Sequence, residues 1–257
     1  MQRSRLHRHL VSLIAGSLIL SALPAGAEEA APSLYRTEML RAAPGQLAAV
    51  IELVKERLPV WKQMHNTGPF WMRHSQGDQW DLLLLFPMGR DFEEYYGASA
   101  RERRDTAAAR SGISETDFQR QLLGLVAWRE DLYVWGPSPE VVSGRFADAG
   151  YFHVEIFLAL AGKRSELLEQ RQMENRYLAK IERPTNLIFT RARGAAWDCY
   201  TIGFYRDIKH FAASADVPAE AEEQAAVEAG FTSSSTIGTY LRELISQHHD
   251  TLAVAVR

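Results

Sequence analysis

Hydrophobic and polar side chains alternate along residues 34–40, which predicts a strand whose two faces meet different surroundings. Residues 45–64 follow with apolar side chains at helical spacing, which predicts an amphipathic helix. Similar patterns predict strands at 70–74, 80–86 and 132–135, and helices at 90–109 and 118–129. The resulting order of strand, helix, two strands, helices and strand is typical of ferredoxin-like domains.

The same order of elements is predicted a second time, after a stretch rich in Pro, Gly and Ser at 137–150. Strands are predicted at 151–158, 187–191, 197–204 and 251–256, and helices at 162–181, 207–213, 219–229 and 233–247. We therefore divide the chain into a first repeat at 28–136, a linker at 137–150 and a second repeat at 151–257.

A short motif marks the corresponding hairpin of each repeat. Gly-Asp-Gln-Trp-Asp at 77–81 returns 117 residues later as Gly-Ala-Ala-Trp-Asp at 194–198. A Trp at a strand entry buries a large surface, and an Asp beside a tight turn accepts backbone hydrogen bonds. We expect these residues to determine the fold rather than the chemistry: Gly77, Trp80, Asp81, Gly194, Trp197 and Asp198.

Each repeat predicts a four-stranded antiparallel sheet with helices on one face, and the open face needs a cover. Two such repeats in one chain predict an α+β fold in which the sheets face each other as a barrel. The tandem plan, Pro44-Gly45 or Ala161-Gly162 before the first helix, and the Gly-x-x-Trp-Asp hairpin resemble the dimeric α+β barrel superfamily. That superfamily includes NIPSNAP-type and EthD-type proteins, antibiotic-biosynthesis monooxygenases and the chlorite dismutase group, and it hosts unrelated activities.

The resemblance to the chlorite dismutase group implies haem as a candidate cofactor, because that group holds haem through a histidine on a helix. His210 and His248 are the candidates for such a ligand here, because both lie on or near predicted helices of the second repeat. Neither lies in a recognisable motif, and we predict no cofactor from the sequence. Zinc-binding spacings of His and Cys are absent as well, so no metal site is predicted.

The first 27 residues have the pattern of an export signal. Three arginines precede an apolar run at 10–23, and Ala25-Gly26-Ala27 fits a cleavage site. We expect cleavage after Ala27, a periplasmic or secreted protein, and no membrane attachment afterwards. An uncleaved membrane anchor is the alternative, although the run is short for a membrane span.

The net charge of −3 at pH 7 provides no basic surface for nucleic acid. The chain also lacks a P-loop, a Gly-x-Gly-x-x-Gly motif and a Gly-x-Ser-x-Gly motif, which argues against nucleotide binding and serine hydrolysis. Its single cysteine, Cys199, falls in a predicted strand and is expected to be a buried apolar residue. We expect a small-molecule ligand as the partner, and a homo-oligomer stays open.

The first strand of each repeat carries the best candidates for chemistry. Tyr35, Thr37 and Met39 form a face that we expect under the helices, while Arg36 and Glu38 alternate onto the face expected inside the barrel. The first strand of the second repeat contributes another carboxylate, Glu155, and a histidine, His153. The predicted ligand cavity between the sheets is lined by Arg36, Glu38, His153 and Glu155, with Tyr200 or Trp71 as aromatic walls.

Three interpretations of this polar face stay open. The first is a binding site for a small, partly apolar molecule, and it is the one we predict. The second is a cofactor-independent monooxygenase or isomerase in which His153 acts as the base. The third is a structural or stress protein with a solid barrel, in which the carboxylates only pair with Arg and His, as buried charges must.

Overall fold

The computed structural model describes residues 31–65 and 68–256, so the predicted export signal lies outside the described residues. The first half comprises β1 (Ser33–Ala42), α1 (Leu47–His65), β2 (Phe70–Gly77), β3 (Leu82–Gly89), α2 (Phe92–Tyr96), α3 (Ala98–Ser111), α4 (Glu115–Leu125) and β4 (Val126–Gly136). The second half comprises β5 (Tyr151–Ala159), α6 (Arg164–Lys180), β6 (Leu187–Gly194), β7 (Cys199–Tyr205), α7 (Ile208–Ala212), α8 (Ala219–Ala229), α9 (Ile237–Arg242) and β8 (Ile245–Ala255). Helix α5 (Pro139–Ala147) joins them.

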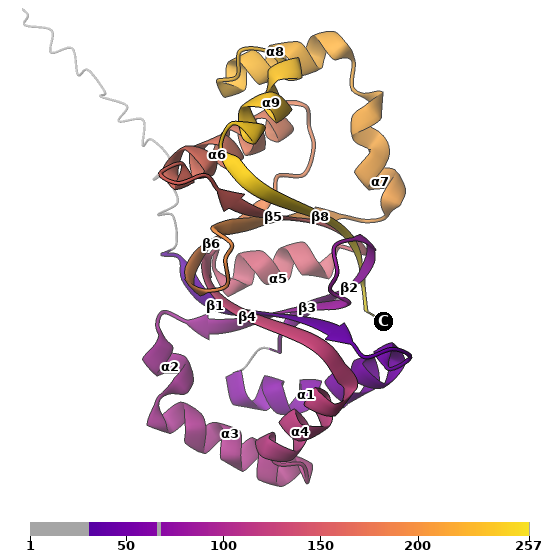
Figure 1. Ribbon diagram of the computed structural model, residues 1–257, viewed down its shortest axis with the longest axis vertical. Coiled ribbons are helices and arrows are strands. Elements are labelled where there is room, and N and C mark those ends of the chain that lie inside the picture. Colours follow the sequence, from indigo (N-terminus) through magenta and orange to yellow (C-terminus); the bar gives the residue numbers. More distant parts are fainter. Residues whose placement is uncertain (1–30, 66–67, 257) are drawn as a thin grey trace, which may run out of the picture. The chain divides into compact units, whose positions relative to one another are not determined.

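The strands form one antiparallel sheet that closes on itself in the order β1-β3-β2-β8-β5-β7-β6-β4. Within each half the first strand lies between the third and the fourth, as in a ferredoxin-like sheet. The pairs β2–β8 and β4–β6 connect the halves through backbone hydrogen bonds, so no strand of the barrel has an unpaired edge. The predicted α+β class is confirmed, and the helices other than α5 cover the outer face of the sheet (Figure 1).

The interior of the barrel is apolar and receives side chains from all eight strands. Alternate residues of each strand point inward, and the buried set includes Tyr35, Met39, Met72, Leu85, Val134, Val154, Phe189, Ile202 and Ala253. A second apolar cluster lies between the outer face of the first half and helices α1 and α4. Both faces of the sheet are therefore covered, as the apolar run of β3 predicts.

Helix α5 occupies the stretch predicted as an irregular linker. Ser138 caps its first turn and Pro139 stands at its first position, where a missing N–H costs nothing. The ring of Phe146 stacks on that of Phe70, with centroids 5.1 Å apart, and also contacts the rings of Phe152 at 5.1 Å and Phe204 at 5.2 Å. The helix lies between the two sheets in Figure 1, and its side chains join the interior cluster.

Helix α1 continues past Pro59, where the buried Val60, Trp61 and Met64 hold its last turns against the sheet. One local expectation is corrected. The last strand begins at Ile245, six residues earlier than predicted, so His248 belongs to β8 and not to a helix end. Among the described residues, no helix is long and apolar enough to span a membrane.

Candidate functional site

The two faces of β1 point to the sides opposite to those predicted. Tyr35, Thr37 and Met39 face the barrel interior, whereas Arg36 and Glu38 face the helices. The closed interior is the driest environment in the fold, so it takes the more apolar face of each strand. Charged side chains instead occupy the helix-covered face, where neighbouring side chains pair with them and water reaches their edges.

Aromatic packing fills the place where a ligand cavity was predicted. Tyr200 lies in the interior, stacked 4.9 Å from Phe189, and its hydroxyl hydrogen-bonds that of Thr37 at 2.7 Å. Burial raises the pKa of the Tyr200 phenol far above its ordinary value. Trp71 lies elsewhere, on the helix-covered face of the first half, opposite Leu84 of β3. The two predicted aromatic walls therefore do not share a cavity.

Charge is balanced on the helix-covered face of the first half. Arg36 contacts the carboxylate of Glu38 at 3.2 Å and that of Asp131 at 3.4 Å. Arg129 contacts the same two carboxylates at 3.1 and 2.8 Å. Two permanent cations thus face two carboxylates, while Glu38 Oε1 has no hydrogen-bond partner among the described residues and burial raises the pKa of Glu38.

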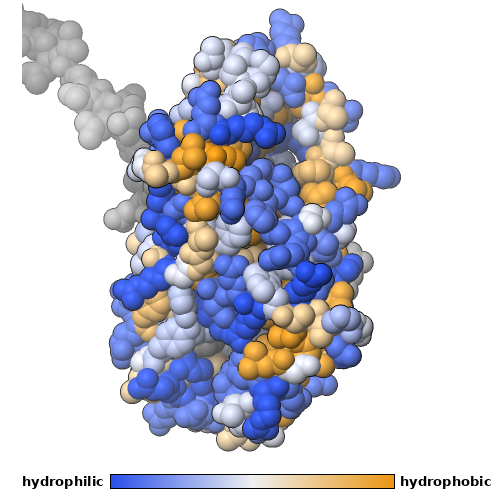
Figure 2. All heavy atoms as spheres, viewed as in Figure 1, coloured by the Kyte–Doolittle hydropathy of each residue, from blue (hydrophilic) through white to orange (hydrophobic). Residues whose placement is uncertain are grey.

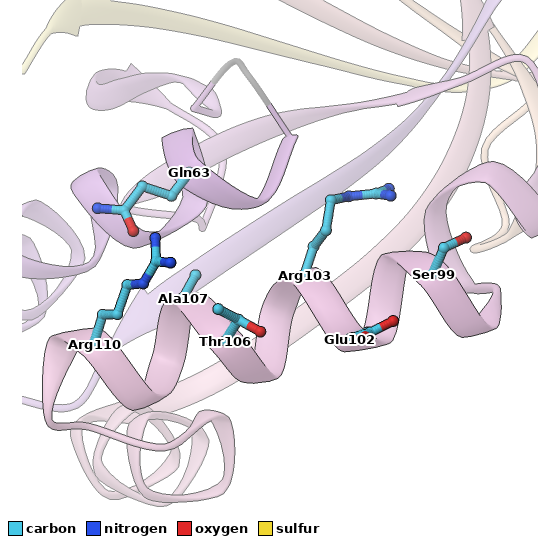
Figure 3. Close-up of a pocket in the computed structure, with 7 residues that line it drawn as sticks. All are labelled: Gln63, Ser99, Glu102, Arg103, Thr106, Ala107 and Arg110. Atoms are coloured by element: carbon cyan, nitrogen blue, oxygen red, sulfur yellow. The ribbon is translucent and has the colours of Figure 1, made fainter.

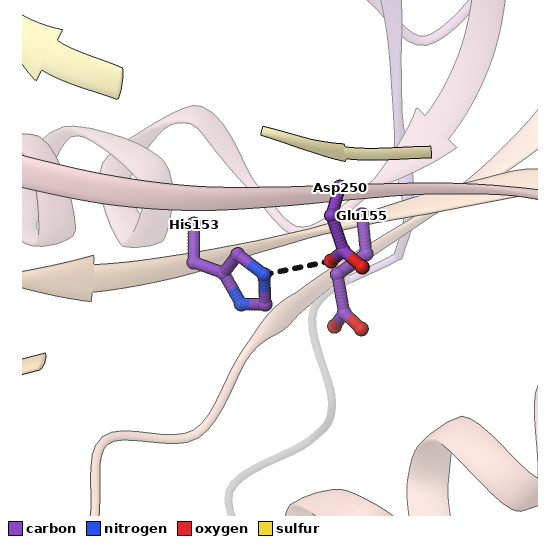
Figure 4. Close-up of side chains that lie close together, drawn as sticks. All are labelled: His153, Glu155 and Asp250. Carbon is purple, nitrogen blue, oxygen red and sulfur yellow. Dashed lines mark hydrogen bonds and ion pairs between the residues drawn. The ribbon is translucent and has the colours of Figure 1, made fainter. Parts of the chain in front are cut away.

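The corresponding face of the second half carries imidazoles in place of the arginines. His153 and Glu155 lie two residues apart on β5, and His248 and Asp250 lie two residues apart on β8, so all four share one face. His153 Nε2 lies 2.9 Å from Asp250 Oδ1 (Figure 4). His248 Nε2 lies 3.5 Å from Glu155 Oε1 and 3.5 Å from Asp250 Oδ1. We call these four residues the imidazole–carboxylate cluster.

Strand pairing places equivalent residues of the two halves in the same register, so the two faces can be compared position by position. Glu38 lies opposite Asp131 in the pairing of β1 with β4, and Glu155 lies opposite Asp250 in the pairing of β5 with β8. Arg129 lies two residues before Asp131 on β4, and His248 lies two residues before Asp250 on β8. The carboxylates are therefore kept while both permanent cations are replaced by titratable side chains.

Helix α6 closes the cluster from the other side. Arg171, which is 2% exposed, lies 3.4 Å from Glu155 Oε2 and pairs with Glu174 at 2.5 Å. Thr201 on β7 donates a hydrogen bond to the same Oε2 at 3.0 Å. These contacts fix one oxygen of Glu155, and the other, Oε1, is turned toward His248.

The protonation states follow from these contacts. Burial opposes the charge of Glu155, but the hydrogen bond with His248 and the charge of Arg171 outweigh it and lower the pKa of Glu155 to about 2. Burial also opposes the charge of His153, but its bond to Asp250 and the nearby Glu155 raise its pKa overall. Burial raises the pKa of Glu174. The cluster therefore combines an ionised carboxylate with an imidazole that readily holds a proton.

Sequence analysis missed Asp250 and considered His248 only as a candidate haem ligand, because the last strand was predicted to begin after both residues. A signal for them exists in the sequence. Trp128-Arg129-Glu130-Asp131-Leu132 precedes an alternating apolar stretch, and residues 247–251 stand in the same position before the last strand of the second half. Aligning the closing strands would have placed His248 and Asp250 beside His153 and Glu155.

The repeated hairpin motif forms equivalent turns in both halves. Asp81 accepts a hydrogen bond from the backbone N–H of Ala42 at 2.8 Å, and Asp198 accepts one from Ala159 at 3.0 Å. Each carboxylate thus ties the end of a first strand to the neighbouring hairpin. The two tryptophans and the two turn glycines of the motif support this geometry, since Trp80 is buried in the interior cluster and both glycines have positive φ: Trp80, Trp197, Gly77 and Gly194.

A second polar group lies near these hairpins. His249 Nδ1 is 3.0 Å from Asp78 Oδ1, and the edge of its ring faces Trp197 at 4.7 Å. Because side chains alternate along β8, His249 points to the face opposite that of His248. It is therefore separate from the imidazole–carboxylate cluster.

The residues around the two haem candidates do not fit the group. His248 stacks on Phe157, and its Nε2 faces two carboxylates, where a macrocycle would need an apolar plane. His210 lies on the five-residue helix α7 and its Nδ1 accepts the N–H of Arg206. The hollow beside it is about 200 Å³, below the usual range of ligand pockets.

A larger hollow of about 450 Å³ lies between α1 and α3 and is open to solvent (Figure 3). Its polar lining consists of exposed side chains, including Arg103 and Arg110 of α3, as is usual for a solvated helix face. Figure 2 shows a mostly hydrophilic surface with small separate hydrophobic areas. The imidazole–carboxylate cluster is therefore the stronger candidate site.

No protein-family model matches the chain, and no curated protein matches it. Among solved structures, an anthrone oxidase-like protein is similar with a TM-score of 0.55 and 11% identity, over 89% of this chain and 93% of that one. A protein from Lactobacillus acidophilus described as a "putative monooxygenase" has a TM-score of 0.51 and 8% identity, over 87% and 93%. A haem-binding protein from Thermus thermophilus has a TM-score of 0.42 and 13% identity, over 87% and 92%, a likeness too low to carry an argument. The first two likenesses show that this chain has the same ferredoxin-like α+β fold.

Proposed function

We propose that this protein binds a small molecule at the imidazole–carboxylate cluster, on the helix-covered face of the second half. The observation that carries the proposal is the contrast between the halves. The first half pairs its two carboxylates with Arg36 and Arg129 on the same strand face, while the second half places His153 and His248 at those positions and pairs Glu155 with Arg171 from α6. A purely structural network has no need of that replacement, because arginines at these positions already give a balanced face.

The cluster suits a molecule that donates hydrogen bonds or carries positive charge and has an apolar part. Asp250 is 57% exposed at its side chain, so a ligand reaches it from solvent. Phe157 stacks against His248, and Phe211 lies 5.4 Å from the ring of His153. These two rings take the role of aromatic walls that the sequence assigned to Tyr200 and Trp71.

Proton transfer is a second candidate function for the same site. If His153 donates its Nε2–H to Asp250, the tautomer is fixed and the lone pair of Nδ1 is available as a base. Such a base would serve a cofactor-independent monooxygenase or isomerase. The fold neighbours described as monooxygenase and oxidase-like are compatible with this reaction class, although at their low identity they share only the fold.

We further propose that the two halves are copies of one ferredoxin-like repeat, and that the chain is exported with cleavage after Ala27. The repeated hairpin motif and the repeated order of elements support the first point. The basic and apolar N-terminal pattern supports the second. Mass spectrometry of the protein from its native compartment tests the cleavage site directly.

A ligand screen by thermal shift tests the binding proposal, using small amines, amides and aromatic phenols with EDTA present. Compounds that stabilise the protein are then measured against His153→Gln and His248→Gln. The control is His249→Gln, which removes the adjacent imidazole on the opposite face of β8. The proposal expects stabilisation to be lost in the first two variants and kept in the control. Stabilisation that survives in both cluster variants, or no stabilising compound at all, would contradict it.

A further inference from the structure

The geometry points to a divalent transition-metal ion bound by His153, Glu155 and Asp250, with His248 as a fourth ligand. One ligand atom from each of the first three residues lies within 4.8 Å of the others. This inference deepens the proposed function and rests on it, because it places the ion at the proposed binding site. Figure 4 shows the imidazole of His153 and the carboxylate of Asp250 turned toward each other, with Glu155 beside them.

Some of the distances match a first coordination shell, while the ligand atoms of His153, Glu155 and Asp250, which lie within 4.8 Å of one another, would draw together around an ion. Nitrogen and carboxylate ligands lie about 2.0–2.2 Å from zinc, so a tetrahedral site holds its ligand atoms about 3.4 Å apart. His248 Nε2 lies 3.5 Å from Glu155 Oε1 and 3.5 Å from Asp250 Oδ1. His153 Nε2 and Asp250 Oδ1, at 2.9 Å, need only a small separation to admit an ion between them.

The local charge favours a cation. Glu155, Glu174 and Asp250 lie together, and within residues 31–65 and 68–256 their ion pairs involve one arginine, Arg171. With neutral imidazoles this group has a formal charge of about −2, which a divalent ion neutralises. The equivalent carboxylates of the first half are paired with Arg36 and Arg129, two fixed positive charges that disfavour a bound cation.

The ligand atoms are oriented in advance by their neighbours. Thr201 and Arg171 bind Oε2 of Glu155 and leave Oε1 for the ion. The ring of His248 is parallel to that of Phe157 at 4.7 Å, which restrains its rotation. Adjacent strands hold all four side chains on one face, and a rigid sheet is the kind of platform on which outer contacts tune a metal site.

The donor set indicates the class of ion. Two imidazole nitrogens and two carboxylate oxygens suit Zn²⁺, Fe²⁺, Co²⁺ or Mn²⁺, while Mg²⁺ and Ca²⁺ prefer oxygen alone. Because Asp250 is largely exposed, a coordination position on that side is accessible to a small molecule. The ion would polarise a bound oxygen atom or activate a bound water there.

Calorimetry with ZnCl₂ and visible absorption with CoCl₂ test the inference on the tag-free, EDTA-stripped chain. We expect one ion per chain for wild type, and a Co²⁺ spectrum typical of four or five ligands. Affinity should fall at least about 100-fold in His153→Gln/His248→Gln and in Asp250→Asn. The control His249→Gln should keep wild-type affinity, and circular dichroism confirms that each variant is folded.

Unchanged affinity in either cluster variant, an equal loss in His249→Gln, or no binding to folded wild type would overturn the metal site. The thermal-shift screen with EDTA separates this result from the proposed function. Organic compounds that bind the metal-free cluster while Zn²⁺ and Co²⁺ do not would refute the ion alone. Metal binding without any organic ligand would refute the small-molecule proposal alone.

Discussion

Arg171 offers the sharpest test of how the second half is held together. Its guanidinium is buried, pairs with Glu174 at 2.5 Å, lies 3.4 Å from Glu155 and donates to Gln170 at 2.7 Å. It also lies 4.6 Å above the ring of Phe157. Replacing Arg171 with Met keeps much of the packing volume and removes the charge, so two buried carboxylates lose their fixed cation.

Removing one partner of a buried ion pair typically costs about 3–5 kcal/mol, because the remaining charge is left uncompensated. We expect Arg171→Met to lower the free energy of unfolding by this amount, out of a total of about 5–15 kcal/mol for a domain. For a protein of this size each kcal/mol corresponds to about 2–4 °C in Tm. A fall of about 6–20 °C is therefore expected.

Urea unfolding followed by circular dichroism, at pH 7.5 with EDTA, measures this loss. Arg176→Met is the control on the same helix, because Arg176 donates to the carbonyl of Ala229 and should cost about 1 kcal/mol. Adding Glu174→Gln to Arg171→Met should restore part of the stability by removing one stranded charge. A loss below about 1 kcal/mol for Arg171→Met, or a loss equal to that of the control, would refute the reasoning.

Three further predictions concern the barrel itself. Thr37→Val and Tyr200→Phe should each lower the free energy of unfolding by about 1–3 kcal/mol, since each leaves a buried hydroxyl without its partner. In a double-mutant cycle measured by urea unfolding, the double variant should cost less than the sum of the two single variants. Additive costs would argue against the hydrogen bond between Thr37 and Tyr200. Gly77→Ala should cost more than about 3 kcal/mol, because its φ is +116° and a methyl group there would lie 2.0 Å from a carbonyl oxygen. Gly45→Ala, in open space at a φ of +77°, should cost about 1 kcal/mol in the same unfolding assay. Burial raises the pKa of the Cys199 thiol to about 12, so a disulfide reagent at pH 8 should label it only after unfolding, and rapid labelling of the native protein would contradict that burial.

Local sequence patterns were sufficient for the order of the strands and for most helices, but not for α5. The alternation along 34–40 predicted a strand that lies inside β1, and the stripe along 45–64 predicted α1 to within two residues at each end. Strand β8 was misplaced because Ile245 to Asp250 has no clear period and follows a helix without a breaker. That error hid two members of the imidazole–carboxylate cluster.

Only half of the candidate site was predicted, because the sequence pattern identified β5 but misplaced β8. His153 and Glu155 were found because they stand in a strongly alternating strand that matches β1. Their partners come from β8 and α6, which contact β5 only after the chain has folded. Arg171 gave no signal at all, since an Arg in a charged helix usually faces solvent.

The sequence by itself determined that each first strand has two unlike faces, because alternation with period two is a local property of the chain. It could not decide which face points inward, because that depends on which side of the sheet becomes driest. Closure through β2–β8 and β4–β6 seals the interior against water and draws the apolar face there. The same closure leaves the charged face under the helices, where Arg balances the carboxylates in one half and His accompanies them in the other.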